Sequence, residues 1–138
     1  MNMQSNSALV RRYFEDILNH ADWTGLDAIT SPDFVEHEVV PSIPATVAGL
    51  KQKYDLLRGG FPDLTFMVED ILEASDRVAV RVTIRGTHTQ LFMGHPATGR
   101  AFTVTSVGIF RIENERIIEH WGVFDQMAML AQLGMFPR

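Results

Sequence analysis

The chain contains no cysteine among its 138 residues. Disulfide frameworks, cysteine nucleophiles and zinc–thiolate sites are therefore excluded, and a reducing cytoplasmic location is favoured. No apolar run approaches the roughly 18 residues that a membrane span needs, and the first residues lack the basic and apolar regions of a signal peptide. We therefore expect a cytoplasmic protein without a membrane anchor.

Basic residues are also scarce: 12 lysines and arginines stand against 17 acidic residues, for a net charge of −5. This balance argues against a nucleic-acid partner and against binding to an anionic membrane surface. The apolar fraction of 46% is typical of a folded globular chain. We expect a single domain over residues 1–138, because a chain of this length buries an adequate core without a metal or disulfide.

The first third of the chain has apolar residues at helical spacing. Ser7 is the expected cap of the first helix, Asp22 that of the second and Thr46 that of the third. The expected elements are helices at 8–18, 23–29 and 46–60, with a short extended segment at 34–39.

From Leu64 onward the apolar pattern has a period of two, which predicts strands. We expect strands at 64–73, 77–85, 102–113 and 116–124, followed by a closing helix that Asp125 caps. Helices followed by a run of consecutive strands indicate an α+β fold. Such a sheet has to curl around the helices to cover its apolar face, which forms a cone with a pocket.

Four short motifs occur one after another along the chain. Asp-Phe-Val-Glu-His ends at His37, Gly-Gly-Phe-Pro-Asp-Leu ends at Leu64, Gly-Thr-His-Thr ends at Thr89, and His-Trp-Gly ends at Gly122. Over about residues 8–134 the chain resembles the SnoaL-like polyketide cyclases and ester cyclases of the NTF2-like superfamily. The resemblance implies a cone-shaped α+β fold with a curved, mainly antiparallel sheet, a deep apolar pocket and a homodimer.

The resemblance also implies a chemistry, with one departure. The best-known members close a polyketide ring by an aldol reaction without a cofactor, which needs a base and a proton donor. Their acidic residue on the last strand corresponds to Gly122 here, and their histidine and glutamine correspond to the stretch Ser106-Val107-Gly108. The resemblance therefore implies the pocket but not the aldol machinery, and the small residues at Ser106, Gly108 and Gly122 are expected to widen it.

Two histidines are the main candidates for a proton carrier, because imidazole titrates near neutral pH. His120 lies on a strand expected to border the cavity, and the alternative is a structural hydrogen bond. His37 stands between Glu36 and Glu38. Only one face of this short strand points inward, so His37 and its neighbours cannot all line the pocket.

Two further residues are catalytic candidates with a plain structural alternative. His88 has the same parity as the valines of the strand at 77–85, which places it on the buried side unless Gly86 forms a bulge. It either serves the pocket or makes a structural hydrogen bond. Asp125 is either a catalytic acid or only the cap of the last helix.

Seven residues are candidates for ligand contact, either as an aromatic wall or as space beside it; the alternative is ordinary core packing. They are Tyr13, Tyr54, Phe92, Phe110, Trp121, Gly122 and Phe124. No metal site is expected, because Glu36, His37 and Glu38 alternate between faces and no His-Glu-x-x-His motif is present.

The resemblance, together with several histidines that could converge, favours a cofactor-independent acid–base enzyme, of cyclase or isomerase type, that acts on an apolar, carbonyl-bearing small molecule. A non-catalytic binding protein with the same pocket is the alternative, which Gly122 supports. An epoxide hydrolase of the same superfamily is a further alternative. Arg81 and Arg85 lie on the face opposite the valines, at a dimer interface or in solvent.

Overall fold

The computed structural model describes residues 5–135. The α-helices are α1 (Asn6–Arg12), α2 (Trp23–Ile29), α3 (Val47–Gly60) and α4 (Gln126–Gln132). The strands are β1 (Thr30–Glu36), β2 (Thr65–Ala74), β3 (Arg77–Thr87), β4 (Ala101–Glu113) and β5 (Arg116–Phe124). The predicted α+β class is confirmed. No helix within residues 5–135 is both long and apolar enough to cross a bilayer.

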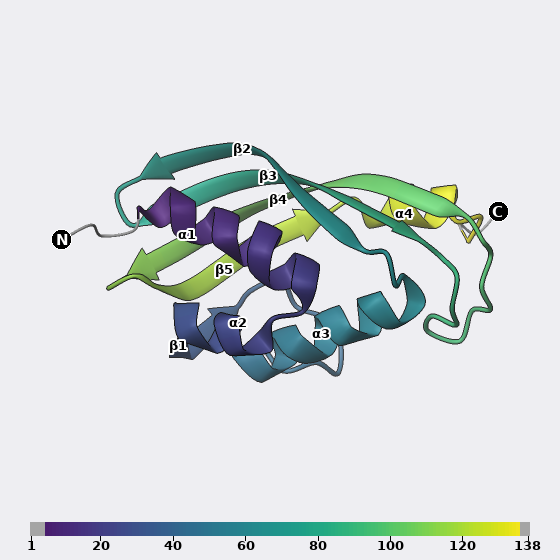
Figure 1. The fold of residues 1–138 in the computed structure, drawn as a ribbon, viewed down its shortest axis with the longest axis horizontal. Coiled ribbons are helices and arrows are strands. Elements are labelled where there is room, and N and C mark those ends of the chain that lie inside the picture. Colours follow the sequence, from purple (N-terminus) through teal and green to yellow (C-terminus); the bar gives the residue numbers. More distant parts are fainter. Residues whose placement is uncertain (1–4, 136–138) are drawn as a thin grey trace.

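The five strands form one sheet in the order β1-β5-β4-β3-β2. Neighbours are antiparallel except β1 and β5, which run parallel. Figure 1 shows the long strands arching over α1, with α2 and α3 below them and α4 at the far end. The last residues of β1 lie beside the middle of β5 within this sheet.

The first helix begins at a different serine from the one predicted. The hydroxyl of Ser5 accepts the amide of Ala8 at 3.1 Å and caps α1. The hydroxyl and amide of Ser7 instead donate to the carboxylate of Glu73 on β2, at 2.8 and 2.7 Å. The prediction of a Ser7 cap is wrong because this tertiary contact takes up the Ser7 side chain. The helix continues through a π-turn at Tyr13–Ile17 and a 3₁₀ turn at Leu18–His20.

Strand β1 starts at Thr30, four residues before the predicted segment. Its pairing with β5 begins at Thr30 and Ile117, and the register shifts before Val35. Pro32 lies inside that shift, so its missing N–H interrupts no regular ladder. Pairing with the long strand β5 therefore extends β1 across residues whose local preference is for a turn.

The core lies between the concave face of the sheet and α1 with its following turns. The predicted alternation on β3 is confirmed: Val78, Val80 and Val82 are buried, while Arg81 lies on the opposite face and pairs with Asp70 at 2.7 Å. Gly86 stays in register with β4, so no bulge interrupts the strand. The alternation consequently continues inward as far as His88, which is fully buried.

Candidate active site

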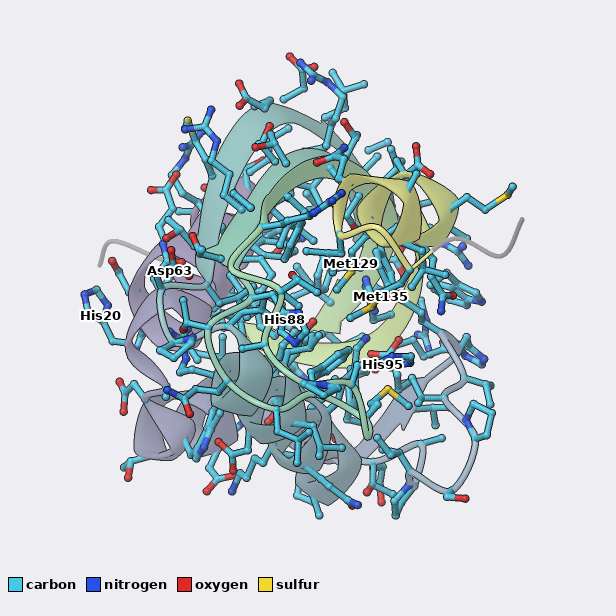
Figure 2. The ribbon with its side chains drawn as sticks, turned by 90° about the vertical axis from the view of Figure 1, so that its right-hand side faces the viewer. His20, Asp63, His88, His95, Met129 and Met135 are labelled. Atoms are coloured by element: carbon cyan, nitrogen blue, oxygen red, sulfur yellow. The ribbon has the colours of Figure 1, made fainter. Side chains whose placement is uncertain are left out.

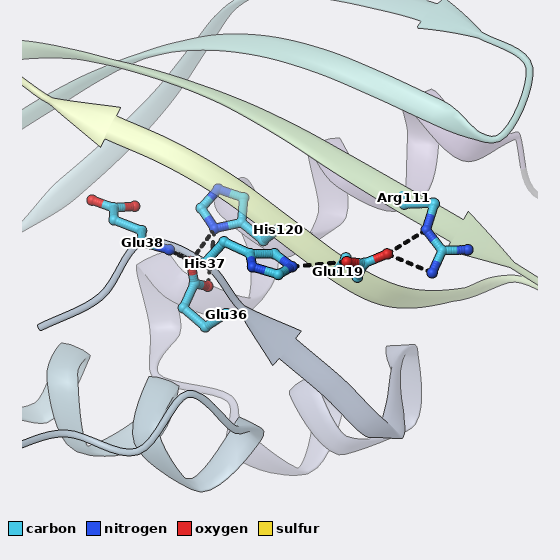
Figure 3. Close-up of polar contacts among 6 residues, drawn as sticks. All are labelled: Glu36, His37, Glu38, Arg111, Glu119 and His120. Carbon is cyan, nitrogen blue, oxygen red and sulfur yellow. Dashed lines mark hydrogen bonds and ion pairs between the residues drawn. The ribbon is translucent and has the colours of Figure 1, made fainter.

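A buried carboxylate–imidazole pair joins the two parallel strands. Glu36 ends β1 directly beside His120 of β5, and Nδ1 of His120 lies 2.7 and 2.9 Å from the two carboxylate oxygens (Figure 3). The residues are only 5% and 6% exposed. Because an ionised carboxylate can only accept, Nδ1 is the donor of this hydrogen bond, and in the neutral imidazole the lone pair is on Nε2.

The His120 ring lies over two glycines that face each other across β4 and β5. A Cβ atom on Gly108 would lie 2.7 Å from Nε2 of His120, and one on Gly122 would lie 2.7 Å from Cε1. Real Cβ atoms essentially never make contacts this short. The two glycines, which we expected to widen the pocket, thus make room for the imidazole.

Glu38 and Lys53 form an ion pair next to His120. One carboxylate oxygen of Glu38 lies 2.8 Å from the Cβ position that Gly122 leaves empty, and 3.6 Å from Nζ of Lys53 on α3. The amide of Glu38 donates to Glu36 at 3.0 Å. The cluster therefore contains two carboxylates, one ammonium and one imidazole.

The surroundings of Lys53, Tyr13 and Tyr54 shift the pKa values of these three side chains and so fix their charge states. Burial opposes the charged form of Lys53, but Tyr54, Glu38 and Glu36 outweigh it and raise the pKa of the ammonium above its usual value. Burial raises the pKa of Tyr13 well above its usual value, with Tyr54 and Glu36 adding to the effect, and burial also raises the pKa of Tyr54. Lys53 is consequently a cation and both tyrosines are neutral at physiological pH.

The cluster opens into a small apolar pocket of about 40 Å³. Its polar lining comes from Glu38, Lys53, Tyr54, Ser106 and His120, and the other nine lining residues are apolar. A water needs roughly 10–15 Å³ by this measure. The space therefore holds a few waters, and a larger ligand requires lining side chains to move.

Three residues of the cluster have the chemistry of metal ligands. Glu36, Glu38 and His120 each offer one ligand atom within 4.8 Å of the others. This group differs from the successive residues considered in the sequence, because Glu36 and Glu38 share a face and the histidine comes from β5. Glu36 already accepts the hydrogen bond of Nδ1 and the Lys53 ammonium already faces Glu38, so both carboxylates have partners within the cluster.

Some of the candidates from the sequence meet at this site. His120, Tyr54 and Phe124 line the pocket, and Gly122 lies under the imidazole. Phe110 packs against the His120 ring with centroids 4.4 Å apart. Tyr13 is buried against Phe110 in the adjoining core.

His37 and Trp121 lie on the opposite face of the sheet. Their rings stack with centroids 4.7 Å apart, and Nε2 of His37 donates to Glu119 at 2.8 Å. Arg111 binds the same carboxylate (Figure 3). The structure therefore brings His37's neighbours Glu36 and Glu38 into the cluster and leaves His37 outside it.

His88, Phe92 and Asp125 also lie apart from the cluster. The Thr98 amide donates to Nδ1 of His88 at 3.3 Å, and within residues 5–135 the buried Nε2 of His88 lacks a hydrogen-bond partner. His88 packs near Phe92 in the interior of one end of the molecule (Figure 2). Asp125 accepts the Ala128 amide at 3.0 Å and caps α4.

Reasoning from the sequence missed Glu36, Glu38 and Lys53 as members of the site. The sequence does contain a signal for Glu36 and Glu38, because the residues on either side of His37 share one face of a strand. No such signal marks Lys53, because a lysine on a helix ordinarily lies in solvent.

A family model and several solved structures match this chain. The family model described as SnoaL-like polyketide cyclase matches residues 8–133. IdmH from Streptomyces antibioticus, a proposed polyketide cyclase, is 34% identical over 95% of this chain and 99% of its own, with a TM-score of 0.84. AclR from Streptomyces galilaeus, a proposed hydroxylase, is 31% identical over 88% of this chain and 80% of its own, with a TM-score of 0.75.

A third structure shares the fold at lower identity. TsrD from Streptomyces laurentii is 24% identical over 98% of this chain and 100% of its own, with a TM-score of 0.84. A search of curated proteins gave no match. The predicted NTF2-like α+β fold is confirmed, and the chain belongs to the SnoaL-like polyketide cyclase family.

Proposed function

We propose that this protein is a cofactor-independent acid–base enzyme that removes a proton from carbon beside a carbonyl of an apolar small molecule. Cyclisation and isomerisation are the reaction classes. The observation that carries the proposal is the Glu36–His120 pair at the pocket: Glu36 occupies Nδ1, which leaves Nε2 as the basic nitrogen on a residue that lines the pocket.

The proton transfers follow from this geometry. Nε2 of His120 takes the proton and the carbon electron pair moves onto the carbonyl as an enolate. Glu36 accepts the Nδ1 hydrogen bond throughout and stabilises the imidazolium that forms. In a cyclisation the enolate carbon attacks a second carbonyl of the same molecule, and the imidazolium returns its proton to the new alkoxide. A positioned general base of this kind contributes about 10²–10⁴-fold in rate.

The sequence departs from the aldol-condensing pattern at Gly122, but a carboxylate is still present in space. Glu38 lies 2.8 Å from the Cβ position of residue 122. An acid from the segment after β1 thus lies next to the place where the family pattern has one on β5. This arrangement supports proton transfer over a purely binding role.

The experiment is hydrogen–deuterium exchange at carbon in D₂O, followed by NMR with β-tetralone and benzoylacetone as probes. We expect wild-type protein to accelerate exchange and His120→Gln to lose that acceleration. His37→Gln is the matched control, because His37 lies on the other face of the sheet. Equal exchange in wild type and His120→Gln would refute the proposal, and binding of the probes without exchange would support the binding-protein alternative.

We also propose that the outer face of the sheet pairs two copies of the chain. Leu72, Val107, Ile109 and Val123 lie on this face and are 72%, 47%, 39% and 71% exposed. Adjacent exposed apolar side chains on a sheet face are typical of an interface. Sedimentation should show a dimer, and Val107→Asp should yield a monomer that retains its circular dichroism spectrum; a monomeric wild type would contradict this.

A further inference from the structure

We propose that Lys53 is the oxyanion-binding group of this pocket and that Glu38 is its positioning residue. The ligand class is a small apolar molecule that carries an enolate or phenolate oxygen. The inference rests on the proposed function for its role in catalysis, because an enolate arises only if His120 removes the carbon-bound proton. Binding of a preformed oxyanion does not depend on that step.

Lys53 and His120 line the same pocket from different elements. Lys53 comes from α3 and His120 from β5, and Glu38 lies between α3 and the imidazole. Nζ of Lys53 is 3.6 Å from the Glu38 carboxylate, whereas a tight ammonium–carboxylate bond spans about 2.7–2.9 Å. An ammonium has three N–H donors. Among residues 5–135 this long contact is the one ion pair that Lys53 makes, which leaves donors available to an oxygen atom in the pocket.

An anionic intermediate in this pocket needs a cation beside it, because two carboxylates are already close to the base. An enolate formed at His120 develops its charge close to the carboxylates of Glu36 and Glu38, which repel it. Within the part of the chain that the structure describes, Lys53 is the one lysine or arginine that lines the pocket. In a site of low dielectric constant, one fixed cation has a much larger effect than in water.

The surroundings keep Lys53 charged and in place. Its side chain is only 12% exposed, and its Nζ lies 5.2 Å from the centroid of the Tyr54 ring. Burial lowers the pKa of the Lys53 ammonium, but Tyr54 and the two carboxylates raise it by more, so the pKa lies above its usual value. A lysine that serves as a nucleophile needs the opposite shift, so the pocket favours electrostatic stabilisation by Lys53.

The competing interpretation is that Lys53 merely neutralises Glu38. The two interpretations differ for a variant that loses both charges together. If Lys53 only balances Glu38, the double variant Lys53→Met/Glu38→Gln should bind an oxyanion as the wild type does. If Lys53 binds the oxyanion, the double variant should lose the preference for the anion even though its net charge equals that of the wild type.

The experiment uses β-naphthol, whose neutral and anionic forms differ in fluorescence. We expect wild-type protein to bind the naphtholate at least about tenfold more tightly than the neutral naphthol, by analogy with the effect of a single oxyanion donor. Lys53→Met and the double variant should lose this preference. Lys51→Met is the matched control, because Lys51 lies on the same helix and pairs with Asp27.

Two variants separate this inference from the proposed function. His120→Gln should lose exchange at carbon but keep the preference for naphtholate, and Lys53→Met should lose both. If the double variant keeps the wild-type preference, or if the wild type shows none, the role of Lys53 is refuted. If naphtholate binding depends on Lys53 while exchange does not depend on His120, the oxyanion site stands and the proposed base is wrong.

Discussion

The most direct test of the site geometry is Gly108→Ala. The added Cβ atom would lie 2.7 Å from Nε2 of His120 and 3.1 Å from the carbonyl oxygen of Trp121. The ring cannot move freely, because Glu36 holds Nδ1 at 2.7 Å and Phe110 packs against the ring with centroids 4.4 Å apart. The imidazole therefore has to leave its position over the glycine pair.

The expected cost follows from overpacking. Forcing one methyl group into a filled site costs about 1–3 kcal/mol, while replacing glycine reduces the freedom of the unfolded chain and returns about 0.4–1 kcal/mol. We expect a net loss on the order of 1–2 kcal/mol in the free energy of unfolding. Because Nε2 is displaced, exchange at carbon should fall by about 10²-fold.

The assay combines urea unfolding with exchange of β-tetralone in D₂O. Gly59→Ala is the control, since a Cβ at this position in α3 meets nothing within 4 Å. This variant should be as stable as the wild type or slightly more stable, with unchanged exchange. If Gly108→Ala matched Gly59→Ala in both measurements, the placement of His120 over the glycines would be wrong.

Three further predictions concern single side chains. Glu36→Gln offers an amide donor to Nδ1, so nitrogen NMR should show the His120 ring proton on Nε2, and exchange should fall by about 10²–10⁴-fold, as for the wrong tautomer in a catalytic triad. Asp125→Ala should cost about 1 kcal/mol of stability through loss of the α4 cap without changing exchange; a loss of exchange would instead support a catalytic role. His37 and Arg111 lower the pKa of Glu119 below its usual value. The resulting stability is present above the unfolded-state pKa and is lost as pH falls through the folded-state pKa, so Glu119→Gln should unfold with a weaker dependence on acid pH.

The sequence alone predicts the features of this fold that depend on neighbouring residues. Asp22, Thr46 and Asp125 cap their helices as predicted, because each side chain reaches an amide three residues ahead. The alternation on β3 predicts its buried face, since successive side chains point to opposite sides of a strand. The family resemblance, which rests on ordered local motifs, is likewise confirmed over residues 8–133.

Only the tertiary structure decides which residues form the site. The sequence shows that His37 and its neighbours cannot all point inward, but β1 is too short and too polar for its own pattern to orient it. Parallel pairing with β5 settles the orientation and brings Glu36 beside His120, 84 positions later. Lys53 joins them because α3 packs under this edge of the sheet. The charges, hydrogen bonds and proton transfer of the site depend on contacts between residues that are far apart in the sequence. Local periodicity carries no information about such contacts.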